Sequence, residues 1–221
     1  MIFTVTKNFM SGHKDTLIVL DLDGVLVKRV RPTESKSTTD KSSGKIDGIN
    51  SIVAKNGSIV YFRDGLEIFI TWLFNNYSVA IFTSMTYHNA KELIDAIFTP
   101  DQIKQLVFIW DRSRCQLHPD YRTNPDIAEH DTCKVLSDIW TNAVVNKDRR
   151  WNCDNVIMVD DTRKKMMVNS ESNYILVSSF DPTDKPHSAD RSFAIIMGQI
   201  VTRTQYANLV KVLAQTSLDT K

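Results

Sequence analysis

The sequence has few cysteines and no excess of one charge, and each absence excludes a class of protein. Only Cys115, Cys133 and Cys153 occur in 221 residues. Their number and wide spacing fit neither a disulfide framework nor a zinc knuckle, so we expect a reducing, intracellular compartment, cytoplasmic or nuclear. Lys and Arg total 27 against 26 for Asp and Glu. No net field attracts nucleic acid, which is therefore not an expected partner, and an anionic ligand must be bound locally.

Long apolar runs are also missing. No stretch of about 18 apolar residues is present, so we expect no membrane span and no membrane partner. The segment 31–45 lacks aliphatic and aromatic residues altogether, and such a segment cannot bury enough surface to order itself. We interpret it as a mobile flap or as a surface insertion without function. The length suits one core, which predicts a single domain over residues 1–221.

Short apolar runs alternate with segments of helical periodicity, which predicts an α/β fold with a central parallel sheet flanked by helices. The predicted strands are residues 16–20, 58–62, 78–84, 106–110, 155–161 and 173–180. The predicted helices are residues 63–76, 85–98, 131–144 and 202–215, the third capped by Asp131. Residues 111–130 are polar and contain two prolines, so they are predicted to form an insertion or a long loop.

Polar residues follow three of the predicted buried strands. Because the carboxyl ends of parallel strands meet at one edge of a sheet, these residues are expected to converge on one crevice. Four carboxylates crowded together without a cation would repel one another, and a hard divalent ion resolves that conflict. So sparse a set of oxygen ligands suits Mg²⁺ better than Ca²⁺. The residues are Asp21 with Asp23, Thr83 with Ser84, and Asp160 with Asp161.

The stretches "DLDGV", "FTS" and "VDD", each after a hydrophobic strand and in this order, resemble motifs of the haloacid dehalogenase-like phosphohydrolases. The blocks "YFRDGLEIFITWLFNNYSVAIFTS", "FIWDRSRC" and "CKVLSDIW" resemble the FCP1-homology branch, which includes the carboxy-terminal-domain phosphatases and the NLI-interacting-factor-like proteins. The resemblance covers roughly residues 16 to 180. It implies a Rossmann-like fold with a short insertion in place of a large cap domain.

The resemblance also implies catalytic roles for individual residues. Asp21 would be the nucleophile that becomes an aspartyl phosphate, and Asp23 the general acid and then the general base. Thr83 would bind phosphoryl oxygens, and Lys134 would neutralise developing charge, although on periodicity alone Thr83 is a helix cap and Lys134 an exposed helix lysine. A Mg²⁺ ion would be held by Asp21, the backbone carbonyl of Asp23, Asp160 and Asp161.

The implied substrate is a phosphoserine or phosphothreonine protein or peptide. Ser84 is a candidate substrate-binding residue or a helix cap. Arg112 and Arg114, in the predicted insertion beside the site, either bind a phosphate of the substrate or are solvated at the surface. Two alternatives remain: a nucleotide or polynucleotide 3′-phosphatase, and a non-catalytic protein-binding module on the same fold. "DDTRKK" stands where many relatives have "DDSP", which leaves the geometry of that loop open. The oligomeric state is not predicted.

Overall fold

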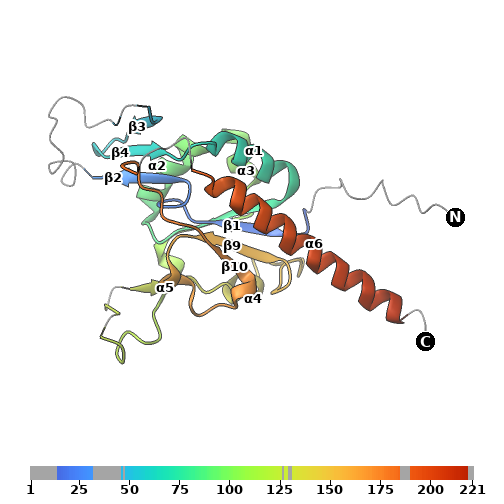
Figure 1. Cartoon of the computed structure of the whole chain (residues 1–221). Coiled ribbons are helices and arrows are strands. Elements are labelled where there is room, and N and C mark those ends of the chain that lie inside the picture. The colour runs from blue at the N-terminus through green and yellow to red at the C-terminus, as the bar shows by residue number, and fades with distance from the viewer. Residues whose placement is uncertain are drawn as a thin grey trace.

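A parallel sheet of five strands forms the centre of the molecule (Figure 1). The computed structural model describes residues 14–31, 46, 48–125, 127–128, 131–184 and 190–218, with side chains as far as residue 207. The strand order is β10-β9-β1-β5-β6, which confirms the predicted fold class. The strands are β1 (Leu17–Leu20), β5 (Ser78–Phe82), β6 (Ile109–Trp110), β9 (Val156–Asp160) and β10 (Tyr174–Leu176).

Helices cover both faces of this sheet, which explains why its strands are continuous apolar runs rather than alternating ones. Ile18 and Leu20 of β1 lie in the core cluster that contains Phe69 of α1 and Ile196 of α6, and Figure 1 shows α6 running across this face. Leu17 and Val19 belong to the cluster on the other face. The helices are α1 (Leu66–Asn76), α2 (Tyr87–Ile97), α3 (Pro100–Gln105), α4 (Ser137–Thr141), α5 (Arg163–Met166) and α6 (Ser192–Leu218).

A second, antiparallel sheet has the order β2-β4-β3. The predicted strand at residues 58–62 is β4 (Ile59–Phe62), and it lies here rather than in the central sheet. Its neighbours β2 (Val27–Val30) and β3 (Ser51–Val53) were not predicted. Apart from Arg31, the predicted flap 31–45 lies outside the described residues.

The predicted helix at 131–144 is wrong in its first half. Thr132 and Cys133 form β8 (Thr132–Cys133), which pairs antiparallel with β7 (Gln116–Leu117), and only α4 is helical. Asp131 accordingly caps no helix; its carboxylate accepts a hydrogen bond from the backbone N–H of Ala128. The cross-strand hydrogen bonds of the hairpin outweigh the helical periodicity in this segment. The predicted insertion contains β7 and the connection from β7 to β8, in which residues 126, 129 and 130 lie outside the described residues.

Several predicted boundaries also change. The closing helix begins at Ser192 rather than at residue 202, and α3 precedes a β6 of only two residues. Two short 3₁₀ turns complete the described elements, η2 (Arg112–Arg114) and η3 (Glu171–Asn173). No helix in the described ranges combines the length and apolar composition that a bilayer span requires.

Candidate active site

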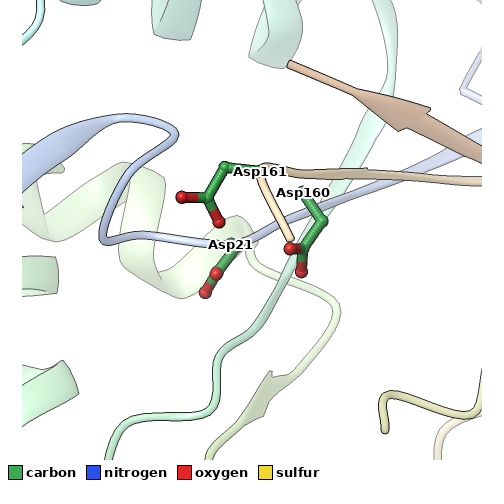
Figure 2. A group of neighbouring side chains, drawn as sticks. All are labelled: Asp21, Asp160 and Asp161. Carbon is green, nitrogen blue, oxygen red and sulfur yellow. The ribbon is translucent and has the colours of Figure 1, made fainter. Parts of the chain in front are cut away.

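The central strands bring three carboxylates together. Leu20 of β1 is in register with Val159 of β9, so Asp21 and Asp160 follow at the same level on adjacent strands. The backbone N–H of Asp21 donates to the carbonyl of Val159 at 3.0 Å. One oxygen from each of Asp21, Asp160 and Asp161 lies within 4.8 Å of the others, and Figure 2 shows these side chains grouped where the strands end.

Lys134 lies fully buried against two of these carboxylates. Its Nζ is 2.7 Å from Oδ2 of Asp160 and 3.1 Å from Oδ1 of Asp21. The side chain of Asn169 fixes the adjoining backbone, because it donates to the carbonyl of Lys134 at 2.7 Å and accepts from the N–H of Leu136 at 2.8 Å. Lys134 precedes α4, and so the expectation of an exposed helix lysine is wrong.

The electrostatics of this group favour the ionised forms of Asp21 and Lys134, whereas burial holds the pKa of Asp160 above its ordinary value despite the nearby ammonium group of Lys134. Burial alone would raise the pKa of Asp21, but the ammonium groups of Lys134 and then Lys165 outweigh it, so the pKa lies below its ordinary value. Burial likewise opposes the charge of Lys134, yet the carboxylates of Asp21 and Asp160 hold its pKa above the ordinary lysine value. Lys165, 3.8 Å from Asp21, was not predicted; in the sequence it stands in a run of basic residues that is typical of a solvated surface.

A tight turn places Asp23 beside this group. Gly24 has φ +89°, and a Cβ there would lie only 2.0 Å from Oδ2 of Asp161, so the turn needs glycine. Asp23 accepts a hydrogen bond from the N–H of Arg29 at 2.9 Å. Burial raises the pKa of Asp23 above its ordinary value, opposed mainly by that hydrogen bond. Asp21 and Asp23 therefore occupy different electrostatic environments two residues apart.

Thr83 and Ser84 follow β5, the other neighbour of β1. Thr83 is buried, and its hydroxyl accepts a hydrogen bond from the N–H of Met85 at 3.3 Å, as a turn-forming residue does. Ser84 is half-buried and lines a pocket with Asp23 and Arg112. The predicted contacts of Thr83 and Ser84 with substrate stay predictions.

The two candidate arginines of the insertion lie apart. Arg112 lines the pocket beside Asp23, and its backbone N–H donates to the carbonyl of Met85 at 2.8 Å. Arg114 lies over the ring of Trp110, 5.5 Å from its centroid, and lines a different pocket. The structure therefore brings Arg112, but not Arg114, to the pocket of Asp23.

The donor set fits a hard divalent cation. Three carboxylates within reach of one ion, two of them fully buried, match the oxygen ligands that Mg²⁺ binds. Thr162 shapes the loop that the sequence left open: its N–H donates to Asp160 at 2.7 Å and its hydroxyl to Asp161 at 2.9 Å. The side chain of Asp23 is not in this group, and its predicted contribution through the backbone carbonyl stays a prediction.

Comparison with known proteins identifies the family of this chain. The family model described as NLI interacting factor-like phosphatase matches residues 16–200, which include every residue of the candidate site. The chain belongs to the NLI interacting factor-like phosphatase family. The predicted resemblance to FCP1-homology phosphatases of the haloacid dehalogenase-like fold is thereby confirmed.

At 17% to 30% sequence identity, one protein sequence and two solved structures are similar to this chain. It is 30% identical over 176 residues to an uncharacterized FCP1 homology domain-containing protein of Schizosaccharomyces pombe, with 78% of this chain and 63% of that protein covered. The solved structure of Fcp1, an essential RNA polymerase II CTD phosphatase, matches with a TM-score of 0.48 at 20% identity, covering 89% of this chain and 50% of that one. Fission yeast Fcp1 bound to beryllium fluoride matches with a TM-score of 0.47 at 17% identity, covering 93% and 56%.

Proposed function

We propose that the protein is a magnesium-dependent phosphatase that hydrolyses phosphate monoesters through an aspartyl phosphate on Asp21. One observation carries the proposal: three carboxylates and a buried lysine, drawn from separate parts of the chain, meet at the carboxyl ends of β1 and β9. Repulsion between these carboxylates destabilises the fold. Binding of a cation together with a phosphate offsets that cost. Membership of a phosphatase family supports the same conclusion.

In the first step, a carboxylate oxygen of Asp21 attacks phosphorus while the bond from phosphorus to the leaving oxygen breaks. Asp23 gives its proton to that leaving oxygen, and an alcohol departs. In the second step, Asp23 takes a proton from water, the water oxygen attacks phosphorus, and the bond to Asp21 breaks to release phosphate. A covalent intermediate divides one very slow hydrolysis into two easier steps.

Asp21, Asp160 and Asp161 are the residues that would hold Mg²⁺. When bound, the ion supplies positive charge that stabilises the phosphoryl oxygens. Lys134 keeps Asp21 in place and ionised, and it adds positive charge next to the phosphorus. Thr83, at the end of β5, is proposed to orient a phosphoryl oxygen.

The proposed substrate is a phosphoserine or phosphothreonine protein. In the described residues, the segment between β6 and β9 contains only η2, the β7–β8 hairpin and α4. So short an insertion leaves room at the strand ends for an extended peptide. The net charge of +1 gives little support to a polynucleotide substrate.

The experiment is turnover of an aryl phosphate with and without Mg²⁺, followed by phosphopeptides and a 3′-phosphorylated oligonucleotide. Asp21→Asn is expected to abolish turnover, while Asp101→Asn, an exposed carboxylate on α3, is expected to retain it. Preferential turnover of the oligonucleotide would replace the proposed substrate. An inactive parent whose melting temperature does not rise with Mg²⁺ and beryllium fluoride would favour the binding module and overturn the proposal.

A further inference from the structure

A polar pocket of about 430 Å³ adjoins the candidate active site. Four basic residues line it, Lys28, Arg29, Arg31 and Arg112, together with Asp23 and the turn that leads into α2. The chain as a whole carries a net charge of only +1. Four cations around one carboxylate are therefore a local concentration of positive charge, which attracts an anion.

The start of α2 adds to this field. Ser84, Met85 and Thr86 line the pocket directly before the helix begins at Tyr87. The first turn of α2 contains no acidic residue, and the N-cap residue Thr86 makes no side-chain capping hydrogen bond. The backbone N–H groups at the start of this 11-residue helix carry partial positive charge. No carboxylate in the first turn of the helix compensates that charge.

Two of the basic residues, Lys28 and Arg29, lie on the paired strand β2. Arg29 pairs with Val60 in the antiparallel sheet, and its N–H donates to Asp23. Its Nε is buried and has no hydrogen-bond partner in the part of the chain that the structure describes. A buried donor without a partner is uncommon in folded proteins and is usually satisfied by a water, an ion or a ligand, and an anion in this pocket would supply such an acceptor.

We infer that this pocket binds a second phosphate of the substrate, so that the enzyme prefers peptides phosphorylated at two nearby residues. The inference rests on the proposed function and names its substrate class more narrowly. Because Asp23 lines the pocket and belongs to the candidate active site, the two phosphates lie close together along the peptide. A phosphate carries nearly two negative charges and accepts several hydrogen bonds, so it matches several cations better than a single carboxylate does.

The experiment compares peptides that share one phosphoserine. A second position, placed one, two or three residues to either side, holds serine, glutamate or phosphoserine. We expect kcat/KM for the doubly phosphorylated peptide at the best spacing to exceed that of the singly phosphorylated one by about 10-fold, with glutamate in between. The advantage decreases at high salt.

Lys28→Gln/Arg112→Gln is expected to bring that ratio close to one. Lys91→Gln/Lys104→Gln removes two exposed charges from α2 and α3, neither of which lines the pocket, and is expected to keep the ratio. If the parent turns over the serine, glutamate and phosphoserine peptides equally at every spacing, the pocket does not bind a second phosphate. That result would leave the proposed phosphatase activity intact. Binding of the same peptides to Asp21→Asn, measured by fluorescence anisotropy, tests the pocket without catalysis: tighter binding of the doubly phosphorylated peptide supports it, and equal binding refutes it.

Discussion

At the scale of single residues, Gly24 brings the main chain close to the acidic group. A Cβ there would lie 2.0 Å from Oδ2 and 2.6 Å from Cγ of Asp161. We expect Gly24→Ala to displace Asp161 and to lower turnover by about 100-fold, since a shift of about 1 Å near the reacting atoms has effects of that size. The rise in melting temperature on adding Mg²⁺ is expected to shrink as well, measured by calorimetry.

Gly48→Ala is the matched control for this substitution. Gly48 has a similar φ of +84°, but nothing lies within 4 Å of a Cβ placed there. Both variants carry the backbone strain of a non-glycine residue at positive φ, about 1 kcal/mol. Only Gly24→Ala is expected to lose the response to Mg²⁺, and an equal response in both variants would show that Asp161 takes no part in the metal site.

Single residues also show what the sequence can predict. Asp21, Asp160 and Asp161 were predicted to converge because parallel strands bring their carboxyl ends to one edge, which periodicity alone reveals. Lys134 and Lys165 reach the same group through the folding of a loop and a short helix, which no periodicity encodes. Their proximity to Asp21 is therefore a result of tertiary packing.

At the scale of elements, Arg63 connects three segments beside the site. Its guanidinium donates to the carbonyls of Val25 at 2.9 Å and Ser178 at 2.7 Å, and its Nε lies 3.0 Å from Oδ2 of Asp190. It also lies over the ring of Phe180. Its side chain is only 2% exposed, so it links the loop after Asp23, the segment after β10 and the start of α6.

Arg63→Met is expected to lower the free energy of unfolding by about 3 kcal/mol, because it leaves two carbonyls and one carboxylate without their partner. Urea denaturation measures this loss. Arg163→Met, which removes a guanidinium 3.9 Å from Glu171 at the surface, is expected to leave the urea midpoint near that of the parent. A loss no larger in Arg63→Met than in this control would refute the connecting role of Arg63.

The elements that the sequence predicts well are the buried ones. β1, β5 and β9 are continuous apolar runs of strand length. Such a run can be recognised from the local sequence alone. β8 was mistaken for helix because it has only two residues, and its pairing with β7 is not visible in the local sequence. β2 was missed because only Val27 of its four residues is fully buried. Short strands depend on their partners, which the sequence does not name.

At the scale of the whole molecule, the site lies where the strand order reverses. The chain passes from β1 to β5 on one side and returns to β9 on the other. Helices and loops diverge at such a point and leave a crevice at the carboxyl ends of the strands. The same topology puts the acids of β1 and β9 next to each other and places the basic pocket at the edge of the crevice.

The central claim is that Asp21 takes the phosphoryl group from substrate. The most direct measurement mixes the protein with a radiolabelled phosphopeptide and Mg²⁺, quenches the reaction in acid within its first turnover, and maps the labelled peptide. We expect label on the peptide that contains Asp21, released by hydroxylamine as expected for an acyl phosphate, and no label in Asp21→Asn. Turnover with the label on another residue, or undiminished turnover by Asp21→Asn, would contradict it.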